Sequence, residues 1–226
     1  MDLELSWEQQ QLKNAVREFA QREIAPLVDE AEEKEEYPVQ LFPRMGSMGY
    51  LCVRYPQQYG ALEVGKVGEC GVIEEIGKVS AGIAAGVMVQ GGIGTAMVLE
   101  NGNEEQKQKW IVPAIKGAKI GAFGLTEPNA GSDAAAIEGT AVKKGDKYII
   151  NATKMFITNA SIADFVCVAA YTDKSKGPKG GVSIIIVDKG TPGFRVSRKL
   201  KKLGYHSSAT AELVFNDCEV PASNLI

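Results

Sequence analysis

The sequence contains a single histidine, His206, among its 226 residues. One imidazole argues against a catalytic triad or a zinc site based on histidine. Cysteine is also scarce, and the four cysteines, Cys52, Cys70, Cys167 and Cys218, lie far apart without the short spacings of a metal site. We therefore expect reduced cytosolic thiols and no bound metal.

Neither sign of charge is in large excess, since 25 Lys and Arg stand against 28 Asp and Glu, a net charge of −3. This balance argues against nucleic acid as the main partner. The chain opens Met-Asp-Leu-Glu, without the basic and apolar segments of a secretory signal. It also lacks a run of about 18 apolar residues, because the stretch 81–97 is interrupted by glycines. These absences predict a cytoplasmic protein without a membrane span.

Residues 1–117 carry apolar side chains at helical spacing, which predicts an all-helical N-terminal domain. Ser6 followed by Gln9 matches a capping box, which indicates the start of the first helix. We expect that helix to break at Pro26 and a later helix to end before Pro113. The reason is that proline lacks the N–H group that continues a helix.

The pattern changes to a period of two from Lys119 onward, where short apolar strands alternate with turns. Strands at this spacing are typical of a β-sandwich or barrel. The predicted fold class is therefore α+β, with a helical domain at 1–117 and an antiparallel β-sandwich or barrel domain at 118–226. Strands are expected at 120–126, 140–144, 148–151, 153–158, 165–170, 182–187 and 211–215, with a hairpin turn at Gly145-Asp146.

The stretch from Phe123 to Ser132 combines the end of an apolar strand with a turn. Asn129 and Gly131 are residues that can take a positive φ in such a turn. Successive N–H groups of the turn can then point into one concavity and hold an anion, and the hydroxyls of Thr126 and Ser132 lie on the same rim. No long helix clearly follows, as a Rossmann loop would require, so any phosphate site here stands on a β scaffold.

A second stretch, Lys154 to Asn159, alternates apolar and polar residues and is expected to be a strand at 153–158. Phe156 and Thr158 then share one face. The ring of Phe156 offers a stacking surface for a flat aromatic ligand, and Thr158 offers a hydroxyl donor beside it. The alternative is that Phe156 is an ordinary core residue of an edge strand.

Together these stretches resemble the acyl-CoA dehydrogenase family, whose motifs match Leu125–Asp133 and Lys154–Asn159. The segments 190–194 and 217–221 resemble the family's middle domain as well. The resemblance covers essentially the whole chain and is closest to short-chain, butyryl-type bacterial members. Departures from the usual motifs are Asn129, Ala160-Ser161 and Phe156 in place of Trp.

The resemblance implies an FAD-dependent oxidoreductase of fatty acid metabolism that oxidises an acyl-CoA thioester between Cα and Cβ. Electrons would pass to an electron-transferring flavoprotein, and the full-length enzyme would be a homotetramer. A bacterial or archaeal cytosol is the expected location, or the mitochondrial matrix for a mature eukaryotic form. The acyl chain length or ring structure of the substrate does not follow from the sequence.

The family's binding positions carry over residue by residue onto the two stretches. The resemblance places the flavin's pyrimidine edge and pyrophosphate at the first stretch, a ring face on Phe156 and N5 near Thr158. Ser132 is placed at the CoA portion of the substrate as well. The implied cofactor-binding residues are Phe123, Gly124, Leu125, Thr126, Gly131, Ser132, Phe156, Ile157 and Thr158.

The glycine-rich segment 81–101 permits two interpretations. Each glycine costs about 1 kcal/mol against alanine inside a helix, so some other gain must offset it. One gain is close helix packing through small side chains. The other, which the resemblance supports, is room for a bound acyl group, and both can hold together.

The family's catalytic base is a glutamate on a third, helical domain that follows the β domain. This chain stops at Ile226, where the β domain would end, and none of its carboxylates matches that base. We therefore expect no catalytic residue within it and little activity from the isolated chain. Two alternatives remain: an enzyme of the acyl-CoA oxidase or flavin monooxygenase type, and a non-enzymatic flavin- or acyl-CoA-binding fragment.

Overall fold

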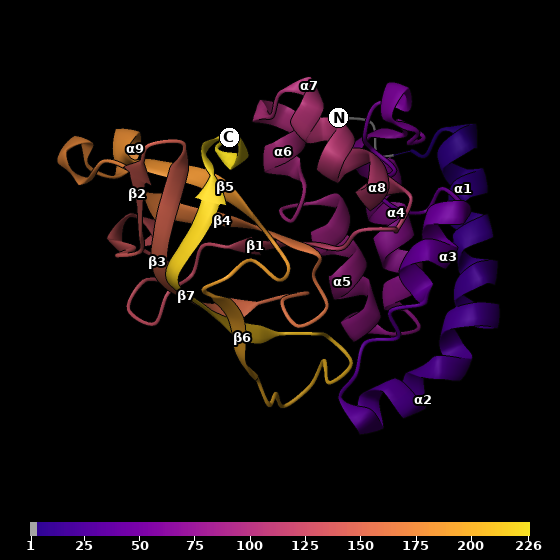
Figure 1. Ribbon diagram of the computed structural model, residues 1–226. Helices are drawn as coiled ribbons and strands as arrows, with labels where there is room; N and C mark the ends of the chain where they lie inside the picture. The colour runs from indigo at the N-terminus through magenta and orange to yellow at the C-terminus, as the bar shows by residue number, and fades with distance from the viewer. Residues whose placement is uncertain (1–3) are drawn as a thin grey trace.

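The computed structural model describes residues 4–226, and Figure 1 shows a helical part beside a curled β-sheet. Residues 1–3 lie outside the described residues. They are the start of the N-terminal stretch in which we expect no secretory signal. The helices are α1 (Trp7–Phe19), α2 (Ala25–Lys34), α3 (Leu41–Ser47), α4 (Gly65–Gly77), α5 (Ala81–Gly91), α6 (Ala96–Asn101), α7 (Glu104–Gln106), α8 (Val112–Ile115) and α9 (Pro178–Gly181). The strands are β1 (Gly121–Gly124), β2 (Thr140–Lys144), β3 (Lys147–Ile157), β4 (Phe165–Tyr171), β5 (Val182–Asp188), β6 (Phe194–Lys199) and β7 (Ala211–Pro221).

The predicted order, a helical part followed by a β part, is confirmed, but the sheet is mixed rather than purely antiparallel. Its strand order is β1-β4-β2-β3-β7-β6, with β5 also paired to β4. β1 and β2 both pair parallel with β4, whereas the β2–β3, β3–β7, β4–β5 and β6–β7 pairs are antiparallel. The β1–β4 pair arises because the β2–β3 hairpin returns the chain to the start of β1, where the Asp164 N–H donates to the Ile120 carbonyl.

Local signals in the helical part were only partly reliable. The capping box of Ser6 and Gln9 is formed at the start of α1. The predicted breaks at Pro26 and Pro113 are wrong, because each proline follows a π-helical turn and lies within the first two residues of the next helix. The wider turn moves the preceding carbonyls off the proline ring, so the helical path continues.

One carboxylate, that of Glu75 on α4, is buried against α1 with its side chain 1% exposed. It accepts hydrogen bonds from Arg17 at 2.9 Å and from Lys78 at 2.8 Å. The hydrogen bond from Arg17 is the main cause that lowers the pKa of Glu75 to about 2. This carboxylate therefore stabilises the α1–α4 contact in its charged form.

We expect Glu75→Gln to lower the free energy of unfolding at pH 7 by about 2 kcal/mol. The folded pKa lies below the unfolded value of 4.5, so the contribution is complete above that value and is lost as the pH falls toward about 2. Urea denaturation at several pH values would show the two proteins converging in acid. Glu30→Gln, which removes an exposed pair with Lys34, serves as a control and should be nearly neutral. If the two proteins still differed by the same free energy of unfolding at pH 2, this explanation would be wrong.

The segment Ala81–Asn101, which contains α5 and α6, is long and apolar enough to cross a membrane by composition alone. However, 67% of its 18-residue apolar window is buried inside the fold, as in the core helix of a soluble protein, so it is weak evidence for a span. Its glycines allow close contacts: a Cβ at Gly82 would lie 2.2 Å from the Ser207 hydroxyl, and one at Gly86 2.5 Å from the Tyr37 ring. These contacts support the helix-packing interpretation.

The same helix also borders open space. A cavity of about 590 Å³ lies between α4 and α5, and the side chains of Met88 and Ile93 beside it are 54% and 56% exposed. Its lining is mainly apolar and includes Ile73, Val89 and Gly92. The glycines therefore serve close packing at one end of α5 and leave space at the other.

The buried side chain of Gln90 fixes the sheet to the helices. Its Nε2 donates to the carbonyls of Ala114 at 3.0 Å and Lys119 at 2.7 Å. Its Oε1 accepts from the Gly121 N–H at 2.8 Å, at the start of β1. Asn159, also buried, donates to the Gly121 carbonyl at 3.3 Å from the other side. β1 is thus held in one position against α5.

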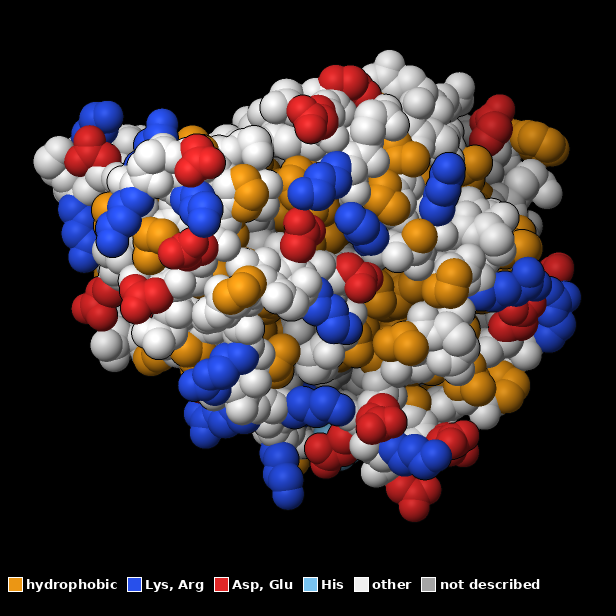
Figure 2. Space-filling model, viewed as in Figure 1, with side chains coloured by type: hydrophobic (Ala, Val, Ile, Leu, Met, Phe, Trp, Pro, Cys, Tyr) orange, Lys and Arg blue, Asp and Glu red, His pale blue; other side chains and the backbone are white. Residues whose placement is uncertain are grey.

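Charged side chains of both signs are interspersed on the face shown in Figure 2. Basic side chains gather near β6 and the loop that follows it, where Arg195, Arg198, Lys199 and Lys201 are exposed. This mixture agrees with the small net charge of −3.

Candidate functional site

The turn after β1 is closed by two hydrogen bonds between Glu127 and Ala130. The Glu127 N–H donates to the Ala130 carbonyl at 2.9 Å, and the Ala130 N–H returns to the Glu127 carbonyl at 3.2 Å. Pro128 occupies the second position of the turn, for which its fixed φ is suited. Neither Asn129 nor Gly131 has a positive φ, so that part of the prediction is wrong. A turn led by proline can close without a left-handed residue.

The rim of this turn is open and polar. Gly131 and Ser132 are exposed, Thr126 is half-buried, and a Cβ placed on Gly131 would meet only open space. Within residues 4–226, the N–H and hydroxyl of Thr126 and the hydroxyl of Ser132 have no hydrogen-bond partner. These groups are therefore available to a ligand that approaches from solvent.

Phe156 lies in a β-bulge of β3 rather than in a regular strand. The register of β3 with β7 shifts between Lys154 and Ile157, and Phe156 takes a φ of 58°. Its side chain is 66% exposed, while the neighbouring Ile157 is 3% exposed. The core interpretation of Phe156 is therefore wrong. The bulge interrupts the expected alternation, and Thr158 follows the strand in a half-buried turn.

Left-handed backbone at a bulky residue costs about 1–2 kcal/mol, and such strain concentrates at functional sites. A strained backbone that turns an aromatic ring out of the core is therefore evidence for a binding surface at Phe156. The hydroxyl of Thr158 has no partner within the described part of the chain either.

The structure brings the two stretches together. The Met155 N–H donates to the Thr126 carbonyl at 2.8 Å, and Lys154 Nζ donates to the Leu125 carbonyl at 3.1 Å. The turn after β1 and the bulge of β3 therefore form one continuous surface. Of the other predicted residues, Phe123 is half-buried against the helical core and Gly124 is buried beside Lys154.

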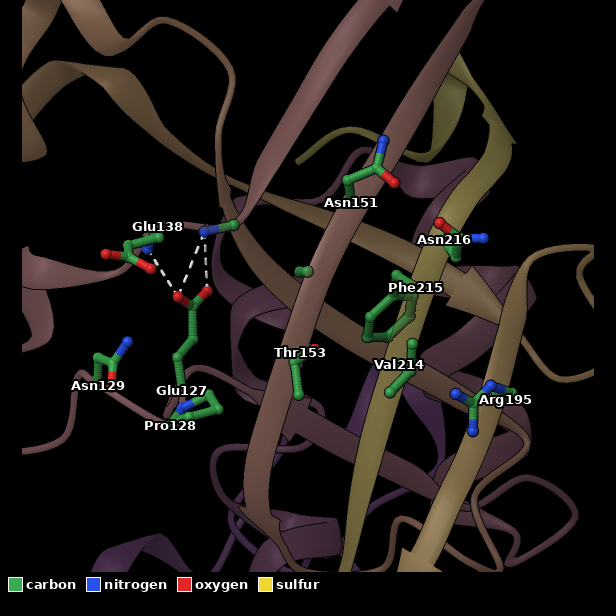
Figure 3. Close-up of a pocket in the computed structure, with 12 residues that line it drawn as sticks. Glu127, Pro128, Asn129, Glu138, Asn151, Thr153, Arg195, Val214, Phe215 and Asn216 are labelled. Atoms are coloured by element: carbon green, nitrogen blue, oxygen red, sulfur yellow. Dashed lines mark hydrogen bonds between the residues drawn. The ribbon is translucent and has the colours of Figure 1, made fainter.

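Sequence reasoning missed a buried ion pair behind this surface. Lys154 Nζ lies 2.6 Å from Glu127 Oε1, with the two side chains 0% and 6% exposed. The Glu127 carboxylate also accepts from the N–H groups of Glu138 at 2.6 Å and Gly139 at 3.0 Å, as Figure 3 shows. Burial lowers the pKa of Lys154, and the hydrogen bond to Glu127 opposes that effect. The sequence offered one indication of this ion pair: Glu127 lies in the first motif and Lys154 in the second.

A polar cavity of about 520 Å³ opens beside the ion pair, between the turn and strands β3, β6 and β7 (Figure 3). Arg195 of β6 faces it from the side opposite to Glu127. Neither Phe156 nor Thr158 lines this cavity, so it is distinct from the surface that carries the predicted binding residues. Among residues 4–226, no group of His, Cys, Asp or Glu is arranged to hold a metal ion.

The fold and this surface define a two-domain α+β protein with a polar turn beside an exposed aromatic ring. The chain belongs to the acyl-CoA dehydrogenase family. The model for the acyl-CoA dehydrogenase N-terminal domain matches residues 6–118, and the model for the middle domain matches residues 122–218. The family resemblance inferred from the motifs is thereby confirmed.

Individual relatives agree with this assignment. The short-chain-specific acyl-CoA dehydrogenase of Clostridium acetobutylicum is 41% identical over the whole chain, which spans 59% of that relative's length. The structure of butyryl-CoA dehydrogenase from Megasphaera elsdenii matches with a TM-score of 0.93 at 38% identity, covering 100% of this chain and 60% of that one. A chain from the structure titled for the electron transferring flavoprotein of Acidaminococcus fermentans matches with a TM-score of 0.95 at 43% identity, covering 100% of this chain and 59% of that one.

Proposed function

We propose that this chain forms the flavin-binding and acyl-CoA-binding part of an FAD-dependent acyl-CoA dehydrogenase. The single observation that carries the proposal is Phe156, an aromatic side chain that is 66% exposed on a backbone with a φ of 58°. Such a ring suits one face of a flat cofactor. Free hydroxyl and N–H groups beside it suit the polar edge of the same cofactor.

FAD, when bound, supplies the acceptor for the hydrogen that leaves Cβ of the thioester. In our proposal the ring of Phe156 covers one face of the cofactor and leaves the other face to the substrate. The N–H and hydroxyl of Thr126 donate to the pyrimidine edge, and Thr158 donates near N5. Gly131 and Ser132 approach the pyrophosphate, where the missing side chain of Gly131 leaves space, and Ser132 also meets the CoA portion.

The wider features of the proposal follow the relatives. We propose a helical domain at 1–117 and a β domain at 118–226, with the acyl group beside α5, where the structure leaves a cavity of about 590 Å³. A neighbour's title that names an electron transferring flavoprotein supports such a protein as the electron acceptor. We further propose that the enzyme is a homotetramer that acts in fatty acid metabolism. We propose a cytosolic location because a bacterial relative matches this whole chain.

We propose that the catalytic base is supplied by protein outside this chain. Glu127 in the flavin turn is held by Lys154 and by two backbone N–H groups, so it is not free to take a proton from Cα. The chain also spans only 59% of the Clostridium relative. We therefore expect little turnover of acyl-CoA by the isolated chain with an artificial electron acceptor, and family-like rates would contradict this.

The visible absorption spectrum of the chain, recorded after incubation with FAD and removal of free flavin, tests the proposal. We expect a retained flavin band that acyl-CoA perturbs. Thr158→Val should weaken FAD binding by about tenfold, because a hydrogen bond is worth about 1 kcal/mol and a buried polar edge left unpaired costs more. Thr140→Val, at a half-buried threonine of β2, should leave FAD binding unchanged. Equal effects of the two variants on FAD binding would contradict the assigned role of Thr158. In a separate experiment, oxygen consumption by the full-length protein would indicate an oxidase rather than a dehydrogenase.

A further inference from the structure

We propose that the Glu127–Lys154 ion pair is a positioning device that sets the orientation of the Thr126 N–H donor toward the flavin. The inference rests on the proposed function, because it assigns the device to the same binding surface. It concerns neither charge in contact with the cofactor nor catalysis by either residue. Both residues act through the backbone of the turn.

The direction of the peptide groups in the turn supports this role. All peptide bonds of the described chain are trans, so each N–H points opposite to the C=O of the same peptide unit. Lys154 Nζ holds the Leu125 carbonyl at 3.1 Å, and this fixes the following Thr126 N–H on the far side of that unit. The Met155 N–H holds the Thr126 carbonyl at 2.8 Å. The Thr126 N–H has no partner within residues 4–226.

Two glycines beside the ion pair leave space for its side chains. A Cβ on Gly124 would lie 3.3 Å from Lys154 Cγ, and a Cβ on Gly139 would lie 2.6 Å from Glu127 Oε1. One glycine therefore clears space for each partner. Neither glycine has a positive φ, so backbone conformation does not require them there. The space for the ion pair contributes at both positions, and at Gly139 the Ala152 Cβ, which would lie 2.8 Å from an added Cβ, contributes as well.

Burying the charges of Glu127 and Lys154 costs free energy, which their role in orienting the turn explains. Two charges at 0% and 6% exposure lose their hydration, and apolar residues of similar size often stabilise a fold as well or better. An apolar side chain at position 154, however, cannot donate to the Leu125 carbonyl. What the lysine provides is a fixed hydrogen-bond donor beneath the turn, and what Glu127 provides is the counter-charge that keeps this donor charged and in place.

The test compares three variants of this chain. Lys154→Met removes the donor. Lys147 lies on β3 as Lys154 does, and Lys147→Met, which removes an exposed ion pair with Glu219, serves as the matched control. The double variant Glu127→Gln/Lys154→Met leaves no buried charge at this site and keeps an oxygen to accept the Glu138 and Gly139 N–H groups. It therefore separates loss of orientation from general unfolding.

The first measurement is amide hydrogen exchange without flavin. The Met155 and Ala130 amides, which donate within the turn, should exchange at least tenfold faster in the double variant than in the unaltered chain or in Lys147→Met. Unchanged exchange of these amides would overturn the inference, whatever the chain binds. This readout does not depend on the proposed function.

The second measurement is FAD affinity together with the visible spectrum of the bound flavin. The double variant should unfold cooperatively, as the unaltered chain does, yet bind FAD at least tenfold more weakly and with a shifted absorption maximum. Lys147→Met should stay within twofold. If the double variant binds FAD with unaltered affinity and spectrum, the inference is wrong. If the unaltered chain itself shows no FAD binding, the proposed function of this chain fails, and the exchange data alone decide whether the pair orders the turn.

Discussion

Gln90→Leu is expected to lower the free energy of unfolding by about 2–4 kcal/mol, because it leaves the buried Gly121 N–H and the partly buried Lys119 carbonyl without partners, while the Ala114 carbonyl keeps only the Gly117 N–H. The amide of Gln90 bonds the carbonyls of Ala114 and Lys119 and the N–H of Gly121. Leucine fills nearly the same volume, so the loss comes from hydrogen bonding rather than from a cavity. Each unsatisfied buried group costs about 1–3 kcal/mol.

The measurement is the midpoint of urea or thermal denaturation, read by far-UV circular dichroism. Gln108→Leu, at an exposed position that bonds only Glu104, is the control and should change stability little. The effect of Gln90→Leu should also reach the candidate site, since Gly121 begins β1, which leads into the turn at Glu127–Ala130. If Gln90→Leu proved as mild as the control, the hydrogen bonds of Gln90 would not be a main contribution to the contact between the helical and β parts.

The features that the sequence predicted well depend on short stretches of chain. The capping box of Ser6 and Gln9 needs only side chains and backbone within one helical turn. The period of two after Lys119 gave the change from helices to strands, because alternation reports burial on one face of a sheet. The two motif stretches were expected to act together, and the hydrogen bond between Met155 and Thr126 joins them.

The errors arose where a local rule meets a longer-range constraint. Pro26 and Pro113 break a regular α-helix, but a π turn before each of them accommodates the ring. β6, at 194–199, was not predicted, because most of its side chains are polar and exposed, with little apolar alternation. The Glu127–Lys154 pair joins residues 27 positions apart, and no spacing rule relates them. The bulge at Phe156 depends on the register with β7, which the sequence of β3 alone does not specify.

Phe156→Asn is expected to weaken FAD binding at least tenfold while the free energy of unfolding stays the same or rises by about 1 kcal/mol. Asparagine tolerates the left-handed conformation better than a bulky aromatic residue, so the strain at a φ of 58° is relieved. The ring is 66% exposed, so its loss removes little buried surface. Stacking and burial of that ring against a flavin are worth about 2 kcal/mol, or more than tenfold in affinity.

Tyr205→Asn is the matched control. Tyr205 also has a left-handed backbone, with a φ of 60°, and its side chain is 53% exposed, but it lies in the loop between β6 and β7. Both substitutions should therefore change stability in the same direction. Only Phe156→Asn should change the dissociation constant for FAD, measured by quenching of flavin fluorescence.

The comparison distinguishes two explanations for an exposed aromatic ring on strained backbone. If the left-handed backbone at Phe156 and at Tyr205 has no functional cause, the two asparagine variants should behave alike in every assay. If the strain at Phe156 is retained because the ring must face a ligand, its relief should stabilise the chain and weaken the complex together. A variant that gains stability and keeps full FAD affinity would remove the observation on which the proposed function rests.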